Sequence, residues 1–185
     1  SDVYKRQLLL LCMRQNEGHF IYALDDAYIH MATAKNFVLN GVWGVTPYHF
    51  SYSVSSLLWP ALLSLAYRLF GVSELSPFII NLILATLLIW LTCTLLRRQG
   101  LSPLLTFTIG IAMIFFMPVP AMIFAGMEHI LQALVTIGFV YLSAQILTHE
   151  KATRSKFVWW LILGAMVTAT RYEGLLLILV VLALF

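Results

Sequence analysis

Three short polar motifs contain half of the acidic residues of this chain. The 185 residues include only 8 Asp and Glu, and four of these lie in the sequences LDDAYIH at 24–30, GMEH at 126–129 and TRYEG at 170–174. Carboxylates and imidazoles are the side chains that most often move protons in catalysis. An arginine binds carboxylates and phosphates through paired hydrogen bonds. Together these residue types could take a proton from a hydroxyl group and hold a phosphate.

The first motif predicts the start of a helix that carries two neighbouring acids. Asp25 is a natural N-cap, and Asn40 followed by Gly41 is a natural stop, so the helix should end near Leu39. Its apolar residues share one face at helical spacing: Ala27, Met31, Ala34 and Val38. Such an amphipathic helix could lie on a bilayer. The structural alternative is that Asp25 and Asp26 only cap the helix and complement its dipole. One acid suffices for a cap, so the second acid favours a function.

The other two motifs place charged residues at the ends of apolar segments. Glu128 and His129 precede an apolar run, where charges are costly unless they are paired or used. The alternative is an ordinary interfacial charge. Arg171 and Glu173 interrupt a second apolar stretch, and could simply form the loop that joins two helices. An arginine at the start of a helix is nevertheless well suited to hold a phosphate.

The composition indicates what kind of protein must position these motifs. Apolar residues make up 61% of the chain and charged residues only 10%, against about a quarter in soluble domains. A soluble domain of this length could not cover so much apolar surface, so we predict an integral membrane protein. The net charge of +3 does not indicate a nucleic-acid partner. The basic residues fall in small groups between apolar runs, as they do in cytoplasmic loops.

Several apolar runs approach the 20 or so residues that cross a bilayer. Four of them cover residues 77–96, 103–124, 130–147 and 157–170. A fifth begins at Leu175, and residues 8–13 are the expected tail of an earlier one. Ser76 and Ser102 are the expected N-caps of the first two, each followed by a proline at the first helical position.

The charges of the loops orient these predicted spans. If Arg97, Arg98 and the basic cluster at 151–156 are cytoplasmic, then all three polar motifs lie at the extracytoplasmic face. Residues 57–70, a shorter apolar run, then form a helix along the membrane surface. Both ends of the chain look cut, and residues 1–7 resemble a non-native leader. We therefore expect residues 1–185 to be the N-terminal part of one longer membrane module.

The motifs, taken in order, resemble those of the GT-C type of membrane glycosyltransferase. The nearest subgroup is the bacterial arabinofuranosyl- and mannosyltransferase-like proteins related to protein O-mannosyltransferases. There the pattern is approximately D-D-A-Y-I, T-S-P-L-W, G-M/L-E and T-R-P-E-G. The matching segments here are 25–29, 55–59, 126–128 and 170–174. Leu57 and Tyr172 depart from it, because each stands where the pattern commonly has proline.

This resemblance implies an all-α fold, a polytopic transmembrane helical bundle whose extracytoplasmic first loop carries juxtamembrane helices. It implies a bacterial inner-membrane enzyme with further spans and an extracytoplasmic domain beyond this chain. The reaction would move a sugar from a polyprenyl-phosphate donor to a hydroxyl of a glycan, lipid or protein acceptor, with inversion. No cofactor is expected to be required, and a divalent metal ion is the alternative.

The resemblance also assigns roles to residues of the motifs. Asp25 matches the position of the catalytic base, and Asp26 would orient the acceptor or share that role. The remaining candidates would bind the phosphate and sugar of the donor: Arg171, His129, Glu128, Glu173 and Tyr28. Arg171 is the first choice for the phosphate and His129 the second. Glu128 and Glu173 would position those two side chains or hydrogen-bond the sugar.

Two functions of other classes compete with this hypothesis. One is a transporter or channel subunit with interfacial acidic residues, for which Pro118 and Pro120 provide the only kink inside an apolar run. Transporter acids usually lie near the membrane midplane, whereas the acids here lie at the ends of the predicted spans. The other is a membrane scaffold without an active site.

Overall fold

The computed structural model describes residues 20–148 and 153–184, and all the regular structure in these ranges is helical. Eight helices follow one another: α2 (Asp25–Asn40), α3 (Leu58–Phe70), α4 (Ser76–Arg98), α5 (Pro103–Phe116), α6 (Val119–Ala125), α7 (His129–Thr148), α8 (Arg154–Thr170) and α9 (Gly174–Leu182). The predicted all-α class is therefore confirmed for the described part of the chain. The leader at 1–7 and the apolar run at 8–13 lie outside the described residues.

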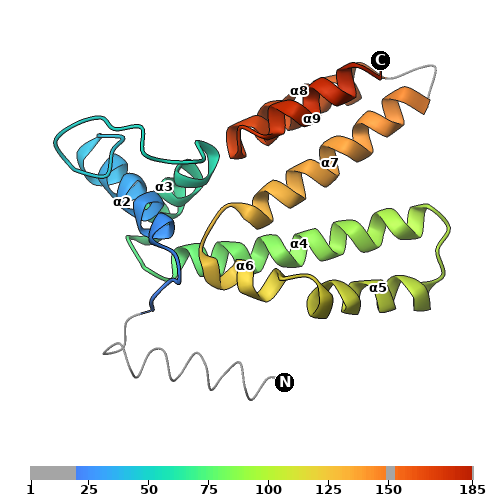
Figure 1. Cartoon of the computed structure of the whole chain (residues 1–185), viewed down its shortest axis with the longest axis horizontal. Coiled ribbons are helices and arrows are strands. Elements are labelled where there is room, and N and C mark those ends of the chain that lie inside the picture. The colour runs from blue at the N-terminus through green and yellow to red at the C-terminus, as the bar shows by residue number, and fades with distance from the viewer. Residues whose placement is uncertain (1–19, 149–152, 185) are drawn as a thin grey trace.

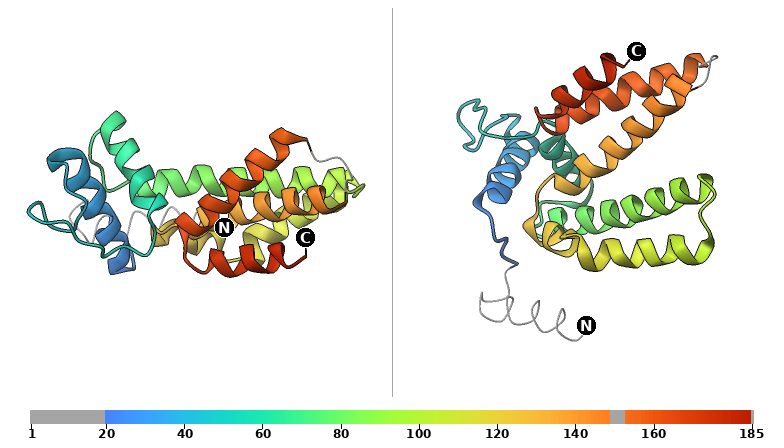
Figure 2. Two further views of the ribbon diagram at one scale, coloured as in Figure 1. Left: turned by 90° about the horizontal axis from the view of Figure 1, so that it is seen from above. Right: turned by 45° about the vertical axis from the view of Figure 1, so that its right-hand side comes forward.

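The longer helices run along the length of the molecule, and the smaller pair α2 and α3 lies at one end of them. Helix α4 packs on α5 and α7, and α7 packs on α8. Helices α2 and α3 pack on each other where α4 begins, α7 begins and α8 ends (Figures 1 and 2). All three polar motifs lie at this end, which we call the polar end. Arg97, Arg98 and Arg154 lie at the opposite ends of α4 and α8.

Two helices of the described chain, α4 and α7, are long and apolar enough to cross a membrane. The pair α5 and α6 passes the same test only if it is taken as one bent span, with an angle of 50° between its halves. The span predicted over 103–124 is therefore broken in two, at the kink predicted from Pro118 and Pro120. Pro118 follows Met117, and a proline forces the preceding residue out of the helical region. Met117 accordingly has φ −90° and ψ 148°.

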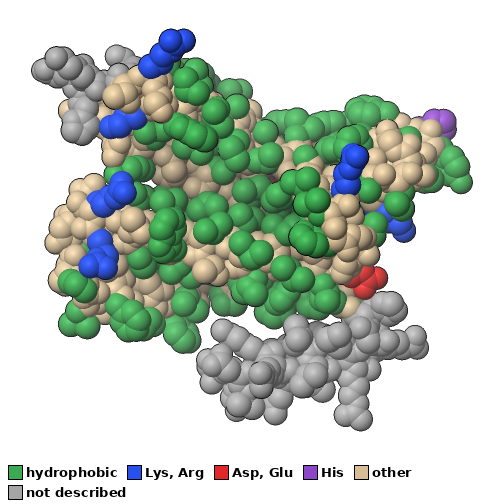
Figure 3. All heavy atoms as spheres, turned by 180° about the vertical axis from the view of Figure 1, so that it is seen from behind, with side chains coloured by type: hydrophobic (Ala, Val, Ile, Leu, Met, Phe, Trp, Pro, Cys, Tyr) green, Lys and Arg blue, Asp and Glu red, His purple; other side chains and the backbone are tan. Residues whose placement is uncertain are grey.

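Helix α8 covers the whole of the predicted run 157–170, and α9 begins one residue before the run predicted from Leu175. Helix α8 has 17 residues and α9 has 9, and neither meets the length of a complete crossing in the described chain. The structure thus supports two or three candidate spans rather than four or more. Hydrophobic side chains nevertheless cover the middle of the molecule, and Lys and Arg side chains lie towards both ends of it (Figure 3).

The helix ends test the predicted caps. Gly41 ends α2 with φ 69°, and Ser102 caps α5 by accepting a hydrogen bond from the backbone N–H of Leu105 at 3.3 Å. Both predictions are confirmed. The expected N-caps Asp25 and Ser76 were wrong, because each is already the first helical residue and the cap positions belong to Leu24 and Leu75, neither with a side-chain hydrogen bond. Asp25 and Asp26 instead lie in the first turn of α2, where the helix dipole favours negative charge.

Three of the four residues of the predicted apolar face of α2 pack against the cluster that includes α3, and the fourth, Ala27, is buried with Phe20 and Tyr22. Ala34 is fully buried together with Trp59 and Leu63 of α3, and Met31 and Val38 pack against the same cluster. An apolar stripe of this kind stabilises a helix pair through the area it removes from water. The α2–α3 pair carries the first motif to the polar end of the longer helices.

Candidate functional site

The turn between α6 and α7 presents Glu128 and is fixed by two other helices. Trp59 of α3 donates from Nε1 to the backbone oxygen of Gly126 at 3.2 Å. Asn81 of α4 donates from Nδ2 to the backbone oxygen of Met127 at 3.0 Å. These carbonyls lie between two helices, where unpaired backbone groups are costly. The two side chains therefore hold the GMEH turn in one position.

The segment before α2 packs onto the same turn through Tyr22. Its hydroxyl donates to the backbone oxygen of Glu74 at 2.6 Å and accepts from the backbone N–H of Phe78 at 3.1 Å. Gly126 has φ 69°, and a Cβ there would meet the ring of Tyr22 at 2.5 Å. Only glycine satisfies both the left-handed backbone and this close approach. The first motif is thereby tied to the second.

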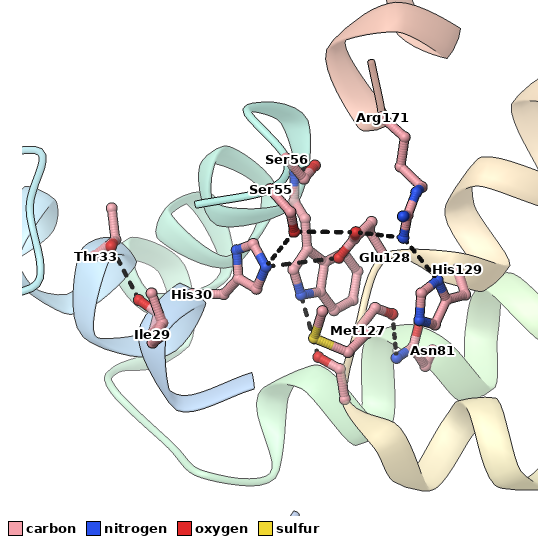
Figure 4. Close-up of polar contacts among 12 residues, drawn as sticks. Ile29, His30, Thr33, Ser55, Ser56, Asn81, Met127, Glu128, His129 and Arg171 are labelled. Carbon is pink, nitrogen blue, oxygen red and sulfur yellow. Dashed lines mark hydrogen bonds and ion pairs between the residues drawn. The ribbon is translucent and has the colours of Figure 1, made fainter. Parts of the chain in front are cut away.

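Glu128 is the centre of the site. Its side chain is 0% exposed, and its Oε1 accepts hydrogen bonds from Nη1 of Arg171 and from the hydroxyl of Ser55, both at 3.3 Å. Its Oε2 lies 3.6 Å from Nε2 of His30. Figure 4 shows Glu128 between His30 and Ser55 on one side and Arg171 on the other. Residues from all three sequence motifs thus surround one buried carboxylate.

The hydrogen bonds that lead from His30 through Ser55 to Glu128 form a chain in which each donor and acceptor can be assigned. Because the hydroxyl of Ser55 donates to Glu128, it is free to accept from Nε2 of His30, which lies 3.2 Å away. His30 is 1% exposed, and its burial lowers the pKa of the imidazole below the ordinary value, against the opposing charges of Glu128 and Asp26. A buried histidine whose pKa is lowered is neutral at pH 7. His30 therefore donates one proton from Nε2 and leaves Nδ1 as an acceptor.

Arg171 joins the second and third motifs. It donates from Nε and Nη2 to the two oxygens of Glu173 at 3.3 and 2.9 Å, and its Nη1 lies 3.3 Å from Nδ1 of His129. An arginine can only donate, so Nδ1 of His129 accepts and its proton lies on Nε2. The hydrogen bonds between Arg171 and Glu173 raise the pKa of the arginine and lower the pKa of the carboxyl.

The backbone near Arg171 is fixed by contacts with α3 and α8. Leu57 donates its N–H to the backbone oxygen of Ala169 at 3.0 Å. Gly174 lies against the last turns of α8, where a Cβ would approach the backbone oxygen of Val167 to 2.6 Å. The start of α3 and the end of α8 are thus held together. This brings Ser55 and Arg171 to the same carboxylate.

A small cavity lies beside this network. It has a volume of about 70 Å³ and is lined by Asp26, Ile29, His30, Ser53 and Ser55. A cavity of this size with several polar groups can hold a hydroxyl group or ordered water. Asp26 lines it because residues 26 and 30 lie one turn apart on the same face of α2.

The remaining candidates of the first motif lie outside this cavity. Asp25 is exposed at the start of α2 and is not among the residues that line it. The hydroxyl of Tyr28 accepts the backbone N–H of Tyr22 at 2.9 Å, and the two rings pack edge to face. Tyr28 thus fixes the segment that leads into α2.

The site contains residues that the sequence interpretation assigned and others that it missed. Four of the assigned residues come together: Glu128, His129, Arg171 and Glu173. His30 and Ser55 were not assigned a role, although Ser55 begins the matching segment 55–59 and His30 directly follows the matching segment 25–29. The spacing of Asp26 and His30 was the available signal for the histidine, since positions i and i+4 share a helix face.

The donor set of the site favours proton transfer and anion binding. Within residues 20–148 and 153–184, no group of three His, Cys, Asp or Glu side chains lies close enough to hold a metal ion. Three carboxylates, one arginine and two imidazoles nevertheless lie within one polar region. Comparisons of the chain with models of known protein families, with curated proteins and with solved structures gave no match.

Proposed function

We propose that this chain is part of a membrane glycosyltransferase that moves a sugar from a polyprenyl-phosphate donor to an acceptor hydroxyl, with inversion. One observation carries the proposal. The buried carboxylate of Glu128 bonds Arg171 of the third motif and contacts His30 of the first. Side chains that are far apart in the sequence, and whose motifs resemble those of the GT-C type, therefore belong to one site.

Arg171 is the group that would bind the phosphate of the donor. Breaking the bond between the sugar and its phosphate leaves additional negative charge on the phosphate, which fixed positive groups stabilise. Arg171 is 30% exposed, so its guanidinium is accessible while Glu128 holds it from the buried side. His129 lies beside it and presents Nε2–H as a second donor.

Asp25 and Asp26 would divide the work on the acceptor. A hydroxyl is a poor nucleophile, and a carboxylate that takes its proton as the bond forms accelerates the attack. We assign this step to Asp25, which matches the base position of the pattern. Asp26 lines the cavity with His30 and Ser55, an arrangement suited to holding a polar group of the acceptor next to the hydroxyl that Asp25 deprotonates. In the reaction the acceptor oxygen bonds the anomeric carbon, its proton goes to Asp25, and the polyprenyl phosphate leaves with the electrons of the broken bond.

An apolar cavity supports a lipid-linked donor. It has a volume of about 380 Å³ and lies between α4 and the broken pair α5–α6, where Phe78, Ala85, Val119 and Phe124 line it. Phe124 stands four positions before Glu128, so the cavity begins near the polar end. We infer that the protein is a polytopic helical bundle and that the isoprenoid chain of the donor occupies this cavity. The basic residues at the opposite end of α4 and α8 favour an extracytoplasmic orientation of the site.

One observation favours a transporter as the second candidate. The break between α5 and α6 is of the kind that lines binding sites in transporters. The acidic residues of the site argue for the enzyme, because they lie on α2, on the α6–α7 turn and on the α8–α9 loop rather than at the break.

The test is a transfer assay with the protein in nanodiscs, expressed with the flanking sequence that its gene encodes. A panel of polyprenyl-phosphate sugars is supplied with native membrane extract, and release of polyprenyl phosphate is followed by mass spectrometry. We expect release by the wild type, loss with Arg171→Ala, and no loss with Arg68→Ala as a control. Absence of release from every donor, with folded protein and acceptor present, would favour the transporter.

A second arm of the same assay tests metal dependence. We expect turnover to continue in EDTA, because a monophosphate donor carries little charge for a metal to neutralise. Loss of turnover in EDTA that a divalent ion restores would show that a metal is required.

A further inference from the structure

Each of the three guanidinium nitrogens of Arg171 makes a polar contact. Its Nη1 faces Glu128 and His129, each at 3.3 Å. Its Nε and Nη2 form the parallel pair that binds both oxygens of Glu173. This is the edge through which an arginine makes its two-point contact with a carboxylate or a phosphate. A phosphate that used this edge would have to take the place of the Glu173 carboxylate.

The two acids on Arg171 differ sharply in their surroundings. Glu128 is 0% exposed and also accepts from Ser55, so it cannot leave without stranding a buried charge. Glu173 is 65% exposed and lies only two positions from Arg171, in the short loop before α9. An exposed ion pair of this kind contributes little to stability and exchanges readily with solvent. Glu173 is therefore the replaceable partner.

The charges of the cluster formed by Arg171, Glu128, Glu173 and His129 also indicate that Glu173 is the replaceable partner. Arg171 contributes one positive charge and the two carboxylates contribute two negative ones, while His129 accepts a hydrogen bond as a neutral ring. The cluster thus carries a net negative charge as it stands. A phosphate monoester, with a charge of about −1.5 to −2 at pH 7, would be repelled until Glu173 moves away. With Glu173 in solvent, the remaining pair is neutral and presents two parallel N–H donors.

We propose that Glu173 is a built-in competitor for a phosphate monoester: its carboxylate occupies the Nε–Nη2 edge of Arg171 in the ligand-free protein and is displaced when the phosphate binds. This inference rests on the proposed function only for the identity of the monoester as the polyprenyl phosphate that leaves in the reaction, because the phosphate of the sugar donor is a diester. The competition itself follows from the two-point contact, the exposure of Glu173 and the charge of the cluster. It makes Glu173 a residue that sets the affinity for the phosphate and eases its release.

The test measures phosphate binding without any transfer reaction. The chain is purified in a non-ionic detergent, and the Nε–H signal of Arg171 is followed by nitrogen-15 NMR while a phosphate is added. Inorganic phosphate serves as the free anion and dodecyl phosphate as the lipid-linked one. The variants are Glu173→Gln, which keeps the shape and removes the charge, and Glu74→Gln, which removes one acidic charge in the α3–α4 loop. Arg171→Lys keeps the charge and removes the forked guanidinium, so the Nε–H signal that disappears in this variant is that of Arg171.

We expect Glu173→Gln to lower the Kd for dodecyl phosphate by roughly fivefold, which is the scale of one exposed ion pair. Glu74→Gln should leave the Kd unchanged. A preference for dodecyl phosphate over inorganic phosphate would identify a lipid carrier as the source of the phosphate, and equal affinities would identify a free anion. In both cases the competition by Glu173 is upheld.

Other results separate this inference from the proposed function. An unchanged or higher Kd in Glu173→Gln, or no binding of either phosphate to that variant, would overturn the inference. Transfer that depends on Arg171 would still support the glycosyltransferase in that case. Conversely, tighter phosphate binding by Glu173→Gln without transfer from any donor would overturn the glycosyltransferase and leave the competition by Glu173 standing.

Discussion

Arg171 donates a hydrogen bond from Nη1 to Oε1 of Glu128 at 3.3 Å, across 43 positions of sequence. The acceptor is a fully buried carboxylate, and the donor comes from the loop between α8 and α9. Removing the cation from such a carboxylate would cost several kcal/mol. The contact therefore fixes the position of the α8–α9 loop relative to the α6–α7 turn.

The two acids that bind Arg171 should differ in their effect on stability. Glu128→Gln removes a buried charge from the Arg171 pair and weakens a charge-assisted hydrogen bond, worth about 1.5–3 kcal/mol. We expect its thermal unfolding midpoint in detergent to fall by several degrees. Glu173→Gln affects an exposed pair and should shift the midpoint far less. Equal shifts would show that burial of Glu128 does not determine the strength of its pairing.

Two glycines with the same backbone conformation should respond differently to alanine. Gly126 and Gly41 both have φ 69°, but a Cβ meets the ring of Tyr22 only at Gly126 and meets nothing within 4 Å at Gly41. Gly41→Ala should cost about 1 kcal/mol from the left-handed backbone alone. Gly126→Ala should cost at least twice as much, because the ring must also move. Denaturant unfolding of both variants measures the difference, and equal costs would contradict the close packing of Tyr22.

Stability should fall as the pH drops below about 6.5, and His30 should be a cause. Burial lowers the pKa of His30 from 6.5 in the folded protein. The unfolded chain therefore takes up a proton near pH 6.5, while the folded protein does so only at lower pH. More protons bind to the unfolded state in this interval, so the free energy of unfolding decreases with falling pH. The lowered pKa of Glu173 acts only below about 4.5.

Unfolding midpoints measured between pH 7.5 and 5 test this prediction. His30→Gln should flatten the dependence, and His49→Gln, a control at an exposed position outside the site, should retain it. A full dependence in His30→Gln would assign the effect to other groups.

Asp25→Asn and Asp26→Asn should affect different kinetic constants in the transfer assay. If Asp25 is the base, Asp25→Asn lowers kcat by about 10²–10⁴-fold with little change in KM for the acceptor. Asp26 lines the cavity beside His30, so Asp26→Asn should mainly raise that KM. The opposite pattern would make Asp26 the base and Asp25 the accessory residue.

Local signals predicted the parts of the fold that depend on neighbouring residues. Gly41 ends α2 and Ser102 caps α5, because a left-handed glycine and an N-terminal hydroxyl act within one turn. The same kind of signal was available for the break after α5, since Pro118 excludes a helical Met117. The run over residues 103–124 was accordingly predicted with a kink at Pro118 and Pro120, but the 50° angle between its halves could not be predicted.

Tertiary contacts determine the features that could not be predicted. Asp25 has the side chain of an N-cap, but the chain enters α2 through the contact of Tyr22 with Tyr28, and Leu24 takes the cap position. Likewise, Ser55 lies in a loop whose sequence has no sign of a partner 73 positions away. The backbone hydrogen bond from Leu57 to Ala169 helps to hold that loop near Glu128. A hydrogen bond between two backbone groups does not depend on side-chain type, so no residue pattern predicts it.

The separation of Glu128 and Arg171 has a consequence for the synthesis of the protein. At about 5–20 residues per second, a ribosome adds Arg171 roughly 2–9 s after Glu128. During that interval the carboxylate has no cation from the third motif, and moving it into an apolar environment is unfavourable. The start of α7 must therefore stay in contact with water while α8 is made. The polar end is completed late, and a ribosome that stalls between the two residues leaves a chain whose Glu128 has no cation beside it.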